Sequence, residues 1–86
     1  MNVLFFIKKA KLLKNGEASV CMRITMNGAR VENNIRMSIE PALWNQAKEC
    51  AKGKSRKTYE LNLYIEQAKI KLRNLFDELE ERNHPV

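Results

Sequence analysis

The chain has 86 residues, of which 44% are hydrophobic and 30% are charged. This length suits one small domain, so we expect residues 1–86 to form a single unit, and the composition excludes a disordered or fibrous chain. The net charge is +6, and residues 1–57 hold 12 of the 16 basic residues but only 4 of the 10 acidic ones, as expected of a polyanion-binding surface.

The first predicted element is a strand over residues 2–10, where apolar and β-favouring residues alternate before a run of lysines. Asn15-Gly16 predicts the turn that follows. The apolar run at the N-terminus is too short for a signal peptide or a membrane span. Together with two cysteines that form no disulfide framework, this favours a cytoplasmic protein with no membrane partner.

Two further strands are predicted over residues 17–26 and 29–39, because each shows a period of two. The second strand alternates Val20, Met22 and Ile24 with polar neighbours, and Asn27-Gly28 suits the tight type I′ turn of a hairpin. Asn33 interrupts the apolar face of the third strand, which predicts a bulge or an edge position there.

The rest of the chain reads as a basic loop followed by one long helix. Pro41 ends the third strand, Trp44 is expected to fold onto the core, and residues 45–57 form an exposed loop rich in lysine and arginine. From residue 58 to 82 apolar residues recur at steps of three and four without Gly or Pro, which predicts an amphipathic helix. Ser55 or Thr58 is expected to cap it, Glu60 to lie in its first turn, and Asn83-His84-Pro85 to end it.

These elements predict an α+β fold, in which a three-stranded antiparallel sheet carries one long C-terminal helix packed on one face (β-β-β-α). The opposite face of the sheet is then left to solvent. Arginine reads guanine, asparagine reads adenine and a threonine methyl contacts thymine in the major groove of DNA, and nearby lysines reach phosphates. The residues expected to contact DNA are Lys8, Lys9, Lys11, Arg23, Thr25, Arg30, Asn34, Arg36, Lys52 and Lys54.

Catalysis and metal binding find no support in the residue pattern. Cys21 and Cys50 lie far apart without a CxxC pair, and His84 is the only histidine. No nucleophile has a base near it in the sequence, so we expect no enzyme activity, no cofactor and no small-molecule ligand.

The order of these features is similar to a known family. The segments "VLFFIKK", "NGEASVCMRITMNGARVE", "IEPALWN" and "KGKSRKTYELNLYIEQAKIKLRNLFDEL" resemble the N-terminal arm-type DNA-binding domain of tyrosine recombinases, the integrases of phages and conjugative transposons. The most telling pieces are Arg23-Ile24-Thr25 with Asn27-Gly28, Pro41 with Trp44, and Gly53-Lys54-Ser55 before a helix that contains Asn62.

The resemblance implies a sheet that enters the major groove of double-stranded DNA at arm sites flanking the recombination site. It also implies a bacterial protein associated with the nucleoid, and it implies that catalysis belongs to a further domain that these 86 residues do not contain. Relatives commonly carry glycine or a small residue at the end of the third strand, where this chain has Arg36.

Two other functions remain open at this point. The long helix of an integrase fragment can serve as a protein interaction module that contacts other integrase subunits or accessory factors, with Tyr64, Lys69 and Lys71 as its patch. A helix packed on a three-stranded sheet also occurs in proteins that bind double-stranded RNA, which use helix and loop contacts across minor grooves.

Overall fold

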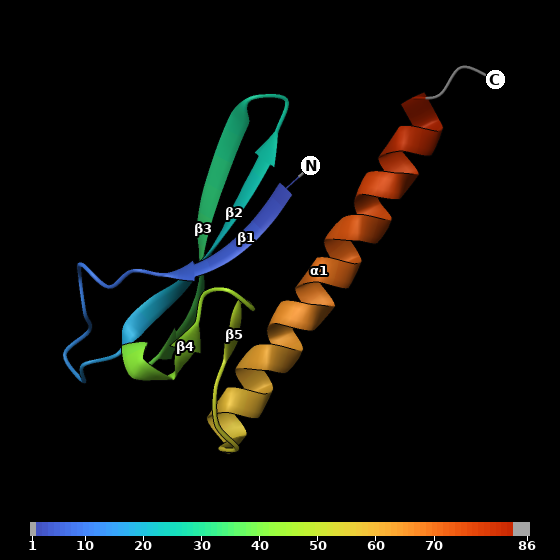
Figure 1. Cartoon of the computed structure of the whole chain (residues 1–86). Helices are drawn as coiled ribbons and strands as arrows, with labels where there is room; N and C mark the ends of the chain where they lie inside the picture. The colour runs from blue at the N-terminus through green and yellow to red at the C-terminus, as the bar shows by residue number, and fades with distance from the viewer. Residues whose placement is uncertain (1, 84–86) are drawn as a thin grey trace.

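The computed structural model describes residues 2–83 and the side chains of residues 2–81 (Figure 1). Three strands form one antiparallel sheet in the order β1-β2-β3: β1 (Asn2–Ile7), β2 (Ala18–Met26) and β3 (Ala29–Ile39). A short 3-10 turn (Pro41–Leu43) leads to a two-stranded sheet of β4 (Trp44–Asn45) and β5 (Cys50–Ala51), and the chain ends in the helix α1 (Arg56–Asn83). The predicted α+β fold of three antiparallel strands and one long C-terminal helix is confirmed.

The 45–57 segment differs most from its predicted form. It contains β5 and the second residue of β4, and α1 already begins at Arg56, so the prediction of a continuous loop is wrong. The Asn45 side-chain oxygen accepts a hydrogen bond from the Lys48 amide at 3.1 Å, and Glu49 closes the turn with a φ of 51°. Strands of two residues show no alternation that a sequence pattern can detect.

The start of the chain also departs slightly from expectation. β1 ends at Ile7 instead of residue 10. The Lys8 amide still donates to the Ser19 carbonyl at 3.0 Å, so the ladder continues for one residue before the chain turns. Further along the connection to β2, the Leu13 amide donates to the Glu17 carbonyl and the Gly16 amide donates to the Leu13 carbonyl. These local hydrogen bonds keep the segment out of the sheet.

The β2–β3 hairpin forms as the sequence predicts. Asn27 and Gly28 have φ values of 51° and 82°, the pair of positive angles that a type I′ turn requires. The hairpin then pairs Met26 with Ala29 and Thr25 with Arg30. Asparagine and glycine adopt this conformation more easily than other residues, which explains why this dipeptide fixes the register.

A bulge interrupts β3 close to the position where Asn33 suggested one. Val20 pairs with Met37 while the next residue, Cys21, pairs with Asn34, so Ile35 and Arg36 have no partner on β2. Arg36 has a φ of 62°, and its amide donates to the Asn34 side-chain oxygen at 2.7 Å. The bulge therefore lies two residues beyond Asn33 and includes Arg36, where the resemblance implied glycine or a small residue.

The core fills the side of the sheet that faces α1. It joins side chains of all three long strands to Trp44, Ala51 and the first half of the helix, where Leu61 and Ile65 are buried. Trp44 is buried as predicted. The buried residues of this cluster are Phe5, Ile7, Ala18, Val20, Ile39, Trp44, Ala51, Leu61 and Ile65.

Side chains of the β4–β5 unit protect the outer edge of β1. The Phe5 amide donates to a Glu49 carboxylate oxygen at 2.6 Å, and the Gln46 amide group donates to the Phe5 carbonyl at 3.0 Å. Asn62 of α1 fixes this unit from the other side, because it accepts from the Ala51 amide at 2.7 Å and donates to the Ala51 carbonyl at 3.0 Å. Polar side chains thus supply the hydrogen bonds that a neighbouring strand would make, both at the free edge of β1 and at the free edge of β5.

The start of α1 is capped by Ser55, one of the two residues predicted for this role. The Thr58 amide donates to the Ser55 hydroxyl oxygen at 3.2 Å. Glu60 was expected in the first turn, but the helix begins two residues earlier than predicted, and Glu60 instead pairs with Arg56 one turn back. The predicted helix end at Asn83-His84-Pro85 lies partly outside the described residues.

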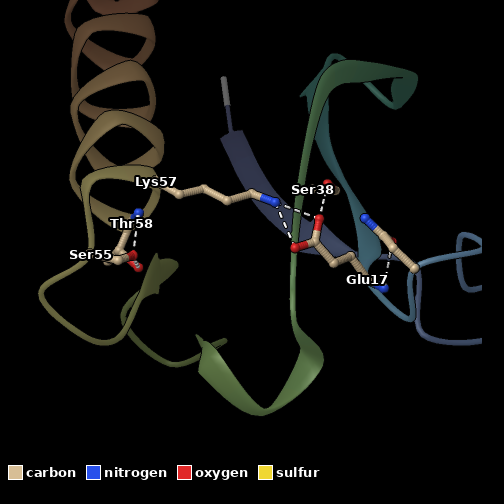
Figure 2. A network of polar contacts seen from close by, with 6 residues as sticks. Glu17, Ser38, Ser55, Lys57 and Thr58 are labelled. Carbon is tan, nitrogen blue, oxygen red and sulfur yellow. Dashed lines mark hydrogen bonds and ion pairs between the residues drawn. The ribbon is translucent and has the colours of Figure 1, made fainter.

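An ion pair ties the helix start to the sheet. Figure 2 shows the Lys57 ammonium reaching the Glu17 carboxylate, at 2.5 and 2.6 Å from its two oxygens, while the Ser38 hydroxyl donates to the same carboxylate at 2.5 Å. The bond from Lys57, followed by that from Ser38, holds the pKa of Glu17 below its ordinary value of 4.5.

Candidate nucleic-acid interface

The face of the sheet opposite α1 follows from the pairing register. Phe5 and Ile7 are buried in the core, so the even-numbered residues of β1 lie on the face away from it. Leu4, Phe6 and their partners on β2 share that face. Because β3 pairs with β2 in register up to the bulge, its even-numbered residues there lie on the same face. We call this surface the open face; its strand residues are Asn2, Leu4, Phe6, Ser19, Cys21, Arg23, Thr25, Arg30, Glu32, Asn34 and Ser38.

Arg23 occupies the middle strand of the open face and is held from two sides. Its guanidinium lies 2.7 Å from a Glu32 carboxylate oxygen on β3 and 5.0 Å from the centre of the Phe6 ring on β1. The cation–π contact and the ion pair position a planar donor group that is still partly exposed. The open face therefore presents a pre-oriented arginine above its central strand.

Arg30 and Thr25 form a cross-strand pair beside the hairpin turn. Together with Arg23 they line a hollow in the surface whose other walls come from the first residues of β1, Asn2 to Leu4. Arg30 is exposed and Thr25 is partly exposed, so both side chains are accessible to a ligand. Three of the predicted contact residues are thus brought together at one end of the open face.

Asn34 and Arg36 lie at the bulge on the outer strand. The Asn34 side-chain oxygen accepts a hydrogen bond from the Arg36 amide. Both residues are exposed. The bulge re-aims this part of the edge strand, as bulges commonly do next to binding sites.

The lysines fall into two separate groups. Lys8, Lys9 and Lys11 are exposed in the connection between β1 and β2, which projects from the sheet on the side away from α1 (Figure 1). Lys52 and Lys54 are also exposed, but they lie in the connection between β5 and α1, on the side of the sheet that the helix covers. The structure does not bring Lys52 and Lys54 together with the open face.

Sequence reasoning passed over two residues of this surface. Glu32 is not among the residues predicted to contact DNA, yet it is the partner that holds Arg23. Cys21 shares the strand face that the period of two assigns to solvent, but it is buried, between Phe6 on one side and Asn34 on the other. A signal for the Arg23–Glu32 pair was available, because a two-residue turn at 27–28 places these two residues directly opposite each other.

Two other kinds of site are absent from residues 2–83. Within residues 2–83, no group of three or more His, Cys, Asp or Glu side chains is arranged to hold a metal ion. The same part of the chain contains no helix that is long and apolar enough to span a membrane. His84 lies outside the described residues. The strand surface described above is therefore the main candidate site.

A comparison with protein families identifies the chain. The model of the arm DNA-binding domain matches residues 5–86. The chain belongs to the arm DNA-binding domain family. Domains of this family occur at the N-terminus of tyrosine recombinases, so the resemblance seen in the sequence is confirmed. No curated protein and no solved structure matches the chain.

The family membership sets the general function of the chain. It is a DNA-binding domain of the integrase type, and its partner is DNA. An arm DNA-binding domain is not catalytic by itself.

Proposed function

We propose that this arm domain binds arm sites in double-stranded DNA by inserting its open face into the major groove, as one DNA-binding unit over residues 1–86. The observation that carries the proposal is the placement of Arg23. Arg23 lies on the middle strand, where an inserted sheet approaches the base edges most closely. Its guanidinium is held there by Glu32 of β3 and Phe6 of β1. A bidentate arginine is the commonest specific contact to guanine.

The neighbouring residues extend this reading surface. Thr25 offers a methyl group for thymine, and Asn34 offers an amide for adenine. Arg30 and Arg36 are exposed on the outer strand and can contact either bases or phosphates. Direct readout thus draws on side chains from two strands of one surface.

Phosphate contacts come from the connection between β1 and β2. Lys8, Lys9 and Lys11 project beyond the sheet on the side away from α1, where the DNA backbone passes if a groove receives the open face. Lys52 and Lys54 lie on the other side of the sheet. They contribute to the electrostatic field that attracts DNA, or they contact the phosphate backbone of DNA that bends around the end of the domain.

The wider protein follows from the family. We propose that the domain is the N-terminal part of a site-specific tyrosine recombinase, whose catalytic domain carries out DNA integration and recombination for a mobile element. Such a protein acts on chromosomal DNA in the bacterial cytoplasm. Arm binding then brings the catalytic domain to its site without taking part in the chemistry.

The test is a comparison of two arginine variants on a selected site. A duplex bound by the wild-type domain is selected from a randomised pool, and its affinity is measured by fluorescence anisotropy. Arg23→Ala is expected to lose about 1–3 kcal/mol of binding free energy at this site, with a smaller loss on unrelated duplexes. An equal loss on every duplex would show that Arg23 contacts phosphates and does not read bases.

Arg56→Ala is the matched control. Arg56 also forms an ion pair with a glutamate, Glu60, but it lies at the start of α1 on the covered side of the sheet. The control removes the same charge and the same kind of ion pair, so it reports what a change in net charge alone does to binding. We expect it to lower the affinity for all duplexes slightly and equally.

A further inference from the structure

The apolar residues of α1 continue beyond the part of the helix that the sheet covers. They alternate steps of four and three along the whole helix, which is the spacing of a coiled-coil seam. The first positions of this seam belong to the core or pack on it, whereas Leu75 and Leu79 are 53% and 42% exposed. The seam residues are Leu61, Ile65, Ala68, Leu72, Leu75 and Leu79.

The second half of α1 extends past the start of the sheet. Figure 1 shows the last turns of the helix running beyond the N-terminal end of β1. A hollow between β1 and the helix is lined by Val3, Lys69, Arg73 and Phe76. On the sheet side Val31 is 57% exposed, so apolar side chains are accessible on the sheet as well as on the helix.

The charges on this half of the helix are segregated. Residues 69–73 contain three basic residues and no acidic one, and residues 77–81 contain four acidic residues and no basic one. A helix that runs antiparallel to an identical copy places the basic segment of each copy beside the acidic segment of the other. The segment is thus complementary to itself in the antiparallel orientation, and not in the parallel one.

We propose that α1 of a second copy of this chain packs antiparallel on the exposed half of the seam. Leu72 of each copy then meets Leu75 of the other across a twofold axis, and the end of each helix occupies the space between the helix and β1 of its partner. Lys71 and Glu78 flank the seam on the same side. In the antiparallel orientation, Lys71 of one copy lies beside Glu78 of the other, and the twofold axis forms this pair twice.

This inference goes beyond DNA binding, since the open face lies on the other side of the sheet. Sedimentation equilibrium of the 86-residue chain, without DNA, tests it. The weight-average mass is expected to rise with concentration from 10.0 kDa towards twice that value. Leu75→Glu is expected to abolish this rise, because it places charges at the centre of the seam, and a circular dichroism spectrum checks that the variant still folds.

Charge exchange gives the decisive result. Lys71→Glu or Glu78→Lys alone is expected to raise the dissociation constant about tenfold, since two attractive pairs become repulsive. An equal mixture of the two variants, or the double variant Lys71→Glu/Glu78→Lys, is expected to restore association. A mass of 10.0 kDa at every concentration would overturn the proposal, as would association that the single exchanges leave unchanged.

Discussion

At the scale of single residues, Arg36 occupies a backbone conformation that a side chain makes costly. Its φ of 62° lies in the left-handed region, which costs a residue with a β-carbon about 1–2 kcal/mol. The sequence resemblance implied glycine or a small residue at this point, and the positive φ gives a physical reason for glycine. The arginine retained here adds an exposed cation beside Asn34.

Arg36→Gly is therefore expected to stabilise the fold. The relief of the left-handed conformation outweighs the larger entropy that glycine loses on folding, for a net gain of about 0.5–1 kcal/mol in the free energy of unfolding. Urea unfolding measures the gain. Arg36→Ala keeps the β-carbon and should give no such gain, and Arg30→Gly, in regular strand, should destabilise. Equal stability of the Gly and Ala variants at position 36 would contradict this account.

Residue-scale sequence reasoning worked where alternation alone decides the outcome. It placed Arg23, Thr25, Arg30 and Asn34 on one face, because a period of two fixes which way a strand side chain points. It could not show that Glu32 holds Arg23 or that Cys21 is buried, because both depend on side chains from neighbouring strands. Partners across a sheet become visible only once the register is known.

At the scale of elements, Asn62 joins α1 to the β4–β5 unit. Its side chain makes both backbone hydrogen bonds of Ala51, in the way a neighbouring strand would. Asn62→Ala leaves these two groups without partners and is expected to cost about 1–3 kcal/mol of unfolding free energy. Thermal and urea unfolding measure the loss.

The matched control for this change is Asn74→Ala, because Asn74 is exposed on the same helix. Its effect should stay within about 0.5 kcal/mol. Asn62→Asp provides a second check, since it keeps an acceptor for the Ala51 amide but has no donor for the carbonyl. Equal stability of the Asn62→Ala and Asn74→Ala variants would show that the hydrogen bonds to Ala51 contribute nothing.

The contact between the helix start and the sheet should depend on pH. Because Glu17 has a pKa below its ordinary value in the folded protein, its ionised form stabilises the fold above pH 4.5, and this contribution is lost as the pH falls through the lower, folded-state pKa. Lys57→Met removes the main cause of the lowered pKa of Glu17. The free energy of unfolding of this variant should therefore fall less steeply below pH 4.5 than that of the wild type. Arg56→Met is the matched control, because it removes an equal charge from the neighbouring residue. Its free energy of unfolding should fall below pH 4.5 as steeply as that of the wild type.

Among the elements, the long ones followed from the sequence and the short ones did not. The hairpin was predicted because Asn27-Gly28 determines its turn, and α1 was predicted because its apolar period runs over many turns. β4 and β5 escaped notice because they are held by side-chain bonds from Gln46, Glu49 and Asn62 instead of by a pattern of their own.

At the scale of the whole molecule, function is divided between two sides of one sheet. The side facing α1 holds the core and supports the fold, and the open face carries the arginines that we propose read DNA. The excess of positive charge in residues 1–57 belongs to the strands and their connections, whereas the C-terminal part of the chain carries a net negative charge. We expect this distribution to orient the domain with its sheet towards DNA and the end of α1 away from it.

An NMR chemical-shift titration of the labelled domain with duplex DNA, at two salt concentrations, tests this division most directly. The account predicts that the amides around Arg23, Thr25, Arg30 and Asn34 shift on addition of DNA, and that the shifts shrink at the higher salt concentration because phosphate contacts weaken. Shifts confined to residues 60–80, or no shifts at all, would contradict DNA binding by the open face.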